Sequence, residues 1–258
     1  MINWPKISLI TPSLNQGKYI EQTIQSVLSQ NYLNLEYIVI DGGSIDGTMQ
    51  ILKKYKSKLK YISEPDSGQS EAINKGLKMA TGEIAGFINS DDRLLPGALK
   101  TVAHVFTKNS DIMWLTGKCK TVDWQGREIR PLITRYKNFW LNRYSYTFLL
   151  IMNFISQPAT FWRKRLIKNS RIGLFDQSLH YSMDYDYWLK IGRLYDPVIV
   201  NKHLAEFRIH DRSKSGVGFR KQFLAEYEIG RRYSQSKLID LAHKIHTLVA
   251  SGIYQLIH

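Results

Sequence analysis

The 258-residue sequence predicts an α/β fold in which helices cover both faces of a mostly parallel sheet. Short apolar runs alternate with segments of helical periodicity through the first hundred residues, and the connections between them are short. Such alternation favours parallel strands with helices packed on each side. Polar residues follow four of these runs, and in a parallel sheet those strand ends meet at one edge, where ligands bind.

Each element of the first half has a local signal. The predicted strands are apolar runs that end in polar or turn-forming residues, at 6–11, 36–40, 59–63 and 83–89. Apolar side chains at helical spacing predict helices over 19–30, 46–55 and 70–80. Pro96 favours the first turn of a further helix.

The second half is less regular. The pattern predicts strands over 111–120 and 198–209, a hairpin turn over 122–128 and a helix over 185–194. Serines and glycines predict a mobile loop over 213–220. From Phe223 onward the pattern is helical, with one apolar face formed by Leu238, Leu241, Ile245, Leu248 and Val249.

Charge divides the chain unevenly. The net charge is +14; residues 1–117 hold 12 Lys and Arg against 11 Asp and Glu, whereas residues 118–258 hold 24 against 11. A basic half indicates an anionic partner, which can be nucleic acid, phospholipid headgroups or a phosphorylated substrate. A merely solvated basic surface is the alternative.

Several classes of protein are excluded or disfavoured. The single cysteine, Cys119, excludes a disulfide framework and zinc sites built from several thiolates. No secretory signal is visible, and the longest uncharged stretch, residues 144–162, is too short and too polar to span a bilayer. We therefore expect a cytoplasmic protein, with peripheral attachment to the inner face of the plasma membrane as a further expectation.

Two carboxylate motifs at strand ends point to chemistry. Asp91 and Asp92 are adjacent, and such a pair can bind a hard divalent cation that neutralises a diphosphate. The alternative is a solvated turn with a helix N-cap. Asp41 precedes Gly42 and Gly43, where a carboxylate can accept a hydrogen bond from a base or ribose, or form an Asx turn. The GxGxxG and P-loop patterns are absent, so a nicotinamide-type site is not supported.

Five segments, taken in order, resemble the inverting nucleotide-sugar glycosyltransferases of family 2. They are Ser8–Asn15, Tyr37–Thr48, Glu64–Ser70, Ala72–Gly76 and Asn89–Asp92. The resemblance covers about residues 5–215 and implies a GT-A-type fold with a Rossmann-like sheet and a helical carboxy-terminal extension. It implies a donor-binding half at 1–117, an acceptor and catalytic-base half of the same domain at 118–222, and the extension at 223–258.

The resemblance implies that a nucleotide diphosphate sugar, most commonly UDP-linked, binds at these strand ends. Asp41 would contact the base, Asp91 the ribose, and Asp92 a Mn²⁺ or Mg²⁺ ion. Asn89 stands where many family members have an aspartate. The other donor-binding positions implied by the motifs are Thr11, Pro12, Ser13, Glu64, Asp66 and Gln69.

Two later segments are similar to the catalytic part of the family. Met183–Trp188 matches an E-D-x-D-x-W element, with Met183 in place of Glu, and implies that Asp184 is the general base. Spacing alone is equally satisfied by an N-cap and a packed turn. Phe207–Ser215 matches a loop that implies His210 as a metal ligand and Arg212 or Lys214 as cations for the diphosphate. The alternative is a surface loop with an incidental histidine.

The acceptor is expected in the aromatic and basic region at 139–165, with Trp162 and Asp186 as contact residues. That region also fits a membrane surface or a core helix with a basic rim. The resemblance implies a saccharide or lipid-linked saccharide acceptor in bacterial surface polysaccharide or glycolipid assembly, and no nucleic acid. A sugar nucleotidyltransferase and a non-catalytic carbohydrate- or membrane-binding module are the competing hypotheses; the first would need a glycine-rich basic loop near Pro12.

Overall fold

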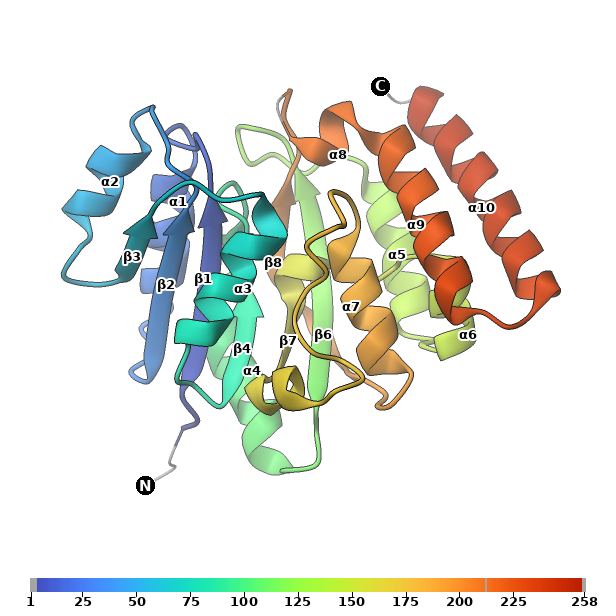
Figure 1. The fold of residues 1–258 in the computed structure, drawn as a ribbon, viewed down its shortest axis with the longest axis horizontal. Helices are drawn as coiled ribbons and strands as arrows, with labels where there is room; N and C mark the ends of the chain where they lie inside the picture. Colours follow the sequence, from blue (N-terminus) through green and yellow to red (C-terminus); the bar gives the residue numbers. More distant parts are fainter. Residues whose placement is uncertain (1–3, 212, 257–258) are drawn as a thin grey trace.

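The computed structural model describes residues 4–211 and 213–256. Within them, an eight-stranded sheet has the strand order β3-β2-β1-β4-β7-β6-β8-β5, and helices flank it (Figure 1). The first four strands in this order pair in parallel. They are β1 (Ile7–Ser13), β2 (Leu35–Asp41), β3 (Lys60–Ser63) and β4 (Ile84–Phe87). The α/β fold with a mostly parallel sheet in the first half is confirmed.

Strand β1 lies at the centre of the parallel half and is buried along its whole length. It continues through Pro12 to Ser13, two residues beyond the predicted end. Strand β4 pairs with β1 only as far as Ile10, so beyond that point β1 has a neighbour on one side only. A proline is tolerated there because its missing N–H removes no ladder bond on the open side.

Glu36 is a buried carboxylate at the opposite end of this sheet. It accepts hydrogen bonds from Ser8 Oγ at 2.6 Å and from the Thr81 backbone at 2.7 Å, and Lys60 Nζ lies 3.0 Å from its Oε1. Burial alone would raise its pKa, but these donors outweigh it and lower the pKa to about 2. The hydrogen-bonded and paired Glu36 therefore stabilises the amino ends of these strands, away from the carboxyl ends that carry the motifs.

The crossover helices bury the apolar stripes that their periodicity predicts. They are α1 (Ile20–Leu28), α2 (Thr48–Lys54) and α3 (Gln69–Met79). Helix α3 lies over the face of β1 and β2, and Gly76 makes this close approach possible. A Cβ at Gly76 would lie 2.6 Å from Ile10 Cγ2. The alternation of strand and helix is thus reproduced in three dimensions.

The second half of the sheet mixes strand directions. Strand β7 is antiparallel to both β4 and β6, while β6 and β8 run parallel and β5 is antiparallel to β8. The elements are β5 (Arg93–Leu94), α4 (Ala98–Lys108), β6 (Trp114–Val122), α5 (Pro131–Leu141), α6 (Tyr146–Ile151), β7 (Thr160–Arg163), α7 (Met183–Gly192) and β8 (Val198–Arg208). Short 3₁₀ helices η1 (Gln157–Ala159) and η2 (Lys164–Lys168) flank β7. The predicted hairpin turn is confirmed by a bridge between Val122 and Glu128.

Much of the aromatic region is core. Trp162 has no exposed surface and packs edge-on against Phe87 and Trp188, and Trp188 stacks on Trp114 with ring centroids 5.8 Å apart. The expectation that Trp162 contacts the acceptor is therefore wrong, because strand β7 places this ring between the sheet and α7. The core-helix interpretation holds for this part of the region.

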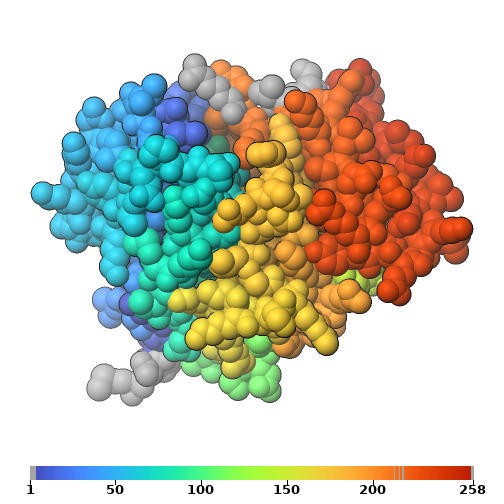
Figure 2. Space-filling view, viewed as in Figure 1, coloured from blue at the N-terminus to red at the C-terminus, as the bar shows by residue number. Residues whose placement is uncertain are grey.

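Three helices form the carboxy-terminal extension, of which α9 and α10 lie at the side of the molecule farthest from β3 (Figures 1 and 2). They are α8 (Lys214–Val217), α9 (Phe219–Tyr233) and α10 (Lys237–Leu256). The extension is confirmed, but the mobile loop predicted over 213–220 is replaced by α8 and the start of α9. Ser213 Oγ caps α8, and Gly216 is needed for close packing, since a Cβ there would lie 2.5 Å from the His210 carbonyl oxygen. Within the described residues, no helix has both the length and the apolar composition needed to cross a bilayer.

Candidate active site

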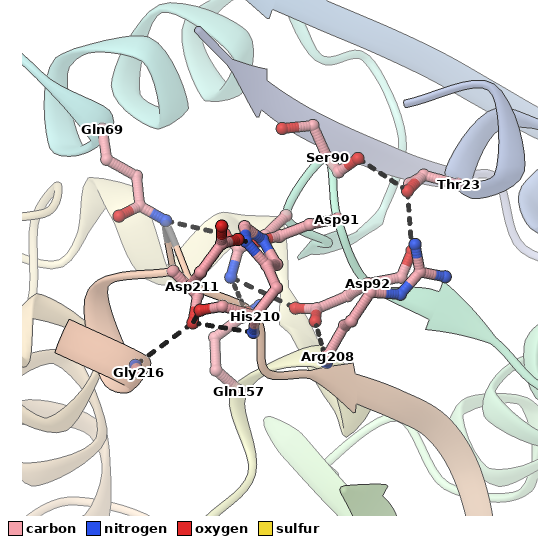
Figure 3. Close-up of polar contacts among 12 residues, drawn as sticks. Thr23, Gln69, Ser90, Asp91, Asp92, Gln157, Arg208, His210, Asp211 and Gly216 are labelled. Carbon is pink, nitrogen blue, oxygen red and sulfur yellow. Dashed lines mark hydrogen bonds and ion pairs between the residues drawn. The ribbon is translucent and has the colours of Figure 1, made fainter. Parts of the chain in front are cut away.

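The site forms where the carboxyl ends of β1, β2 and β4 meet the end of β8. Figure 3 shows residues that follow β4, begin α3, lie in η1 and follow β8 converging on one another. His210 and Asp91 are separated by 119 positions in the sequence yet are in direct contact. The short pairing of β5 with β8 holds the two halves in this relation, because β5 follows immediately after Asp92.

Asp91 and His210 form an acid–imidazole pair. His210 Nε2 lies 3.0 Å from Asp91 Oδ2, and the imidazole stacks on the Tyr19 ring with centroids 4.5 Å apart. Asp91 keeps 17% of its side chain exposed, whereas His210 is almost completely buried. A carboxylate and an imidazole nitrogen are both good ligands for a divalent cation, and Asp91 remains open to solvent. The structure thus brings together two residues that the motifs associate with metal and donor.

Asp92 is in a different environment from Asp91. It has no exposed surface, and its Oδ1 and Oδ2 accept hydrogen bonds from the Arg208 backbone at 2.8 Å and from Asn89 Nδ2 at 3.2 Å. Burial and the neighbouring charge of Asp91 raise its pKa well above the usual value. In this structure Asp92 ties the end of β4 to β8, while Asp91 is the more exposed of the two carboxylates, and the role of Asp92 as metal ligand stays a prediction.

Arg208 is a functional candidate that the motifs did not single out. Its guanidinium lies over the Tyr19 ring at 5.0 Å, and Nη2 donates to Gln22 Oε1 at 2.8 Å. Nε and Nη1 are buried without a hydrogen-bond partner among the described residues. Burial lowers the pKa of Arg208, opposed by the charges of Asp92 and Asp91. In the sequence, Arg208 lies at the end of a predicted strand and within the matched segment Phe207–Ser215, but no role was assigned to it.

An amide network links the two halves of the site. Gln69 Nε2 donates to Asn89 Oδ1 at 2.6 Å, and Asn89 Nδ2 reaches Asp92 and also Gln157 Oε1, the latter at 3.3 Å. An amide at position 89 can donate to Asp92 while accepting from Gln69, whereas a carboxylate would face Asp92 with like charge. This accounts for the asparagine where many family members have an aspartate. Gln157 was also missed, because nothing in its local sequence marks it.

Asp184 lies in the first turn of α7. Its side chain is half-buried, and among the described residues no other side chain donates a hydrogen bond to its carboxylate. Burial raises its pKa, with the Tyr185 backbone N–H and the charges of Lys137 and Lys214 opposing the rise. A carboxylate with a raised pKa and no competing side-chain donor is suited to accept a proton. Met183 is buried beneath α3, with its Sδ 2.7 Å from Ser70 Oγ.

Lys214 lies between the donor-side network and Asp184. Its Nζ donates to Gln69 Oε1 at 3.3 Å and to the His180 carbonyl at 3.2 Å. Desolvation lowers its pKa, and the charge of Asp184 opposes this. It also lines a small open pocket between the start of α3 and the segment before α7. Arg212, the other cation predicted here, lies outside the described residues.

Three of the predicted donor residues are buried at the ends of β1 and β2. Asp41 is fully buried, and its carboxylate accepts from Ser44 Oγ at 2.5 Å, Ser63 Oγ at 2.7 Å and the Ser44 backbone at 2.9 Å. These contacts order the glycine loop, as in the Asx-turn alternative, and the contact of Asp41 with a base stays a prediction. Thr11 and Pro12 are also buried, with Thr11 Oγ1 3.1 Å from Tyr37 Oη.

Three more of the predicted donor residues lie around the ends of β1 and β3 and differ in burial. Ser13 Oγ is buried without a hydrogen-bond partner among the described residues, so it is available to a ligand. Asp66 lies against Gly42, where a Cβ would come within 2.9 Å of its Oδ2, and burial raises its pKa. Glu64 is exposed and pairs with Lys75 at 2.9 Å. Ser13 and Asp66 are therefore better placed for donor contact than Asp41.

Asp186 has a structural role. It is buried, accepts a hydrogen bond from Tyr233 Oη at 2.6 Å and pairs with Lys190 at 2.8 Å. These contacts fasten α7 to α9 and leave no exposed oxygen for an acceptor. The expectation that Asp186 contacts the acceptor is therefore corrected, because the helix period turns it toward α9 while Asp184 faces the site.

Glu226 on α9 is a buried carboxyl near Asp184. Its Oε1 accepts from Asn153 Nδ2 and Gln222 Nε2, each at 3.2 Å. Burial raises its pKa to about 7; those two hydrogen bonds lower it, and the charge of Asp184 raises it further. The folded protein therefore retains a proton on Glu226 at a pH where the unfolded chain, with a pKa near 4.5, has lost it.

The proton on Glu226 predicts a pH dependence of stability. The unfolded chain binds fewer protons between about pH 5 and pH 7, so the free energy of unfolding is expected to fall as pH rises through this window. Each unit of pKa difference corresponds to about 1.4 kcal/mol, so Glu226→Gln should become more stable than wild type by about 2–3 kcal/mol across it. Urea denaturation at a series of pH values measures this. Glu228→Gln, an exposed change on the same helix, is the control, and parallel curves for wild type and Glu226→Gln would contradict the assignment.

The sequence of this chain is similar to those of known glycosyltransferases. The family model for glycosyl transferase family 2 matches residues 8–169, which is more than half of the chain. An uncharacterized glycosyltransferase of Rickettsia typhi is 27% identical over 87% of this chain and 70% of its own length. A putative teichuronic acid biosynthesis glycosyltransferase of Bacillus subtilis is 37% identical over 45% of this chain and 48% of its own.

A solved structure has the same fold. Residues 1–349 of Staphylococcus aureus TarS superpose with a TM-score of 0.65 and 25% identity, covering 87% of this chain. The chain spans 65% of that TarS chain, slightly less than two thirds. TarS has also been solved with UDP and with UDP-GlcNAc. With its family match, its GT-A-type sheet and its strand-end site, the chain belongs to glycosyl transferase family 2, a family of inverting glycosyltransferases.

Proposed function

We propose that this glycosyltransferase moves a sugar from a UDP-linked donor to a hydroxyl of a saccharide or lipid-linked saccharide acceptor during assembly of a surface polysaccharide. The UDP-bound structures of TarS support the choice of nucleotide, and the Bacillus subtilis relative supports the process. The net charge of +14, concentrated after residue 117, favours an anionic acceptor such as one carried on a lipid diphosphate.

The single observation that carries the proposal is the contact of Lys214 with Gln69 beside Asp184. Gln69 belongs to the donor-side network with Asn89, while the charge of Asp184 acts on Lys214. A cation that neutralises the departing diphosphate and a base that activates the acceptor therefore lie at one place. Sugar transfer with inversion needs these two groups on opposite sides of the anomeric carbon.

Asp91 and His210 are the residues that would hold a divalent cation. Among the described residues there is no group of three or more His, Cys, Asp and Glu side chains able to bind a metal. Mg²⁺ and Mn²⁺ sites of this kind commonly use one or two protein ligands, with water and substrate phosphates completing the shell, so the pair fits. A bound Mn²⁺ or Mg²⁺ would stabilise the negative charge of the leaving diphosphate.

The chain's own residues account for the proton and the leaving charge. The Asp184 carboxylate accepts the proton of the acceptor hydroxyl as its oxygen attacks the anomeric carbon. The bond from that carbon to the diphosphate oxygen breaks, and its electron pair leaves with UDP. In this proposal, the positive charges of Lys214 and of the buried Arg208 guanidinium stabilise this developing anion. The anomeric configuration is inverted in the single displacement.

A thermal-shift series with UDP-, GDP- and dTDP-sugars, each with Mn²⁺ or with a chelator, tests the donor. A ligand at a hundredfold excess over its Kd stabilises the folded state by about 2.7 kcal/mol, so binding is directly visible. We expect a UDP-sugar to raise the Tm in Mn²⁺ and much less in chelator. Stabilisation by another nucleotide sugar would reject UDP, and no stabilisation by any of the three would reject the donor site. Release of UDP, followed with the stabilising donor, then measures turnover.

A further inference from the structure

Helix α10 has an apolar face that the other described residues leave uncovered. Seven large apolar side chains along the helix are each between 48% and 87% exposed. They are Leu238, Leu241, Ile245, Leu248, Val249, Ile253 and Leu256. At helical spacing they share one side over five turns, which is far more continuous than scattered surface leucines. Figure 2 shows α10 at the outer edge of the molecule.

The inner face of α10 accounts for its packing within the chain. His243 and Thr247 are buried, and a Cβ at Gly230 of α9 would lie 2.6 Å from His243 Nδ1. Tyr254 packs against Phe223 with ring centroids 5.1 Å apart. The helix is therefore held on α9 by one face, and its opposite face is presented outward.

Helix α5 continues this surface. Its Tyr136 stacks on His246 of α10 with centroids 6.3 Å apart, and Leu132, Tyr136 and Phe139 are 43–74% exposed. The Arg143 guanidinium lies 3.9 Å from the centre of the Phe139 ring. Exposed aromatic rings next to arginine are typical of segments that lie in a lipid headgroup layer. We call the exposed apolar residues of α5 and α10 the outer surface.

The charges around the outer surface are positive. No aspartate or glutamate occurs between Glu128 and Asp176, a stretch that includes all of α5. The only acid of α10, Asp240, has a buried Oδ1, whereas Lys237 and Lys244 are exposed. An isologous contact between two copies would bring this basic rim against itself. An anionic partner would instead be attracted to it.

We infer that the outer surface binds an anionic phospholipid bilayer, with α10 lying in the headgroup plane. Apolar side chains flanked by lysines on one helix fit an interfacial helix, and the absence of acids suits anionic headgroups. Helix α10 packs on α9, which follows directly on α8 and its Lys214. The outer surface is therefore linked through α9 and α8 to the part of the chain that lines the site. The inference itself does not depend on the identity of the donor.

Vesicle flotation of the full chain tests the inference. The vesicles contain phosphatidylcholine alone or phosphatidylcholine with phosphatidylglycerol, at low and high salt. Wild type should float with the anionic vesicles and lose binding as salt rises. Leu241→Gln with Ile245→Gln should reduce that binding about tenfold or more, since it removes buried apolar contact. Lys237→Gln with Lys244→Gln should weaken binding to anionic vesicles most at low salt.

The control is an equally polar change elsewhere. Leu33→Gln alters a fully exposed residue just before β2, away from the helical extension, and it should bind vesicles like wild type. All variants should keep wild-type Tm and wild-type stabilisation by donor in the absence of vesicles, which separates this test from that of the proposed function. Failure of wild type to float, or unchanged flotation of Leu241→Gln with Ile245→Gln, would overturn the inference. The inference would also be overturned if wild type sediments as a dimer and only Leu241→Gln with Ile245→Gln sediments as a monomer. A second copy of the chain would then cover the outer surface.

Discussion

Replacing Asp184 with asparagine is expected to lower turnover about 10²–10⁴-fold while donor affinity stays near wild type. The carboxylate lies beside Lys214 with a raised pKa and no competing side-chain donor among the described residues. Asparagine keeps the volume but cannot accept the hydroxyl proton. UDP release under saturating donor measures turnover, and the donor-induced Tm shift measures binding.

Asp186→Asn is the matched control, two positions along the same helix. It removes the charge that pairs with Lys190 and one of the two acceptor oxygens inside the α7–α9 contact, so it should lower the free energy of unfolding by about 1–3 kcal/mol. Its turnover should fall much less than that of Asp184→Asn. If Asp184→Asn unfolds or loses donor binding instead, Asp184 is structural and the base lies elsewhere.

Replacing Asp91 with asparagine is expected to abolish the Mn²⁺-dependent part of donor stabilisation and to lower turnover by about two orders of magnitude or more. A bound cation supplies several kcal/mol of charge stabilisation to the leaving diphosphate, and Asp91 is the exposed carboxylate of the pair with His210. The Tm without ligand should change little, because Asp91 has no part in the contact between β4 and β8. Thermal shift with donor in Mn²⁺ and in chelator gives both quantities.

Asp92→Asn distinguishes this arrangement from the one implied by the motifs. Asp92 accepts from both the Arg208 backbone and Asn89, and an amide there would turn an N–H toward one of these donors. We expect a large loss of stability in the absence of ligand, of about 1–3 kcal/mol. The opposite result would identify Asp92 as the metal ligand. In that case Asp92→Asn keeps full stability but loses the Mn²⁺-dependent part of donor stabilisation, whereas Asp91→Asn retains this part.

Local patterns predicted the elements closest to the sheet centre. Strands such as β2 are apolar on both faces, so a continuous run such as residues 36–40 indicates them without any tertiary information. Helices α1 and α3 bury the stripes that their period shows. The motifs also placed Asp91, Gln69 and His210 in one site, because each follows or begins an element at the same sheet edge. Two predictions were wrong: Pro12 does not end β1, and residues 213–220 are largely helical instead of a mobile loop. The effect of a proline or glycine depends on the neighbouring segments that pack against it.

Burial and pairing could be decided only by the tertiary structure. Asp91 and Asp92 are chemically identical neighbours, and β8, more than a hundred residues away in the chain, buries one of them and leaves the other open. The same long-range packing encloses Trp162, places the unmarked Arg208 and Gln157 in the site, and turns the apolar face of α10 outward. The periodicity of a helix specifies which residues share a face but not what that face meets. The sequence by itself therefore determined the fold class, the family and most residues of the site, whereas contacts across the sheet decided which carboxylates are available to a ligand.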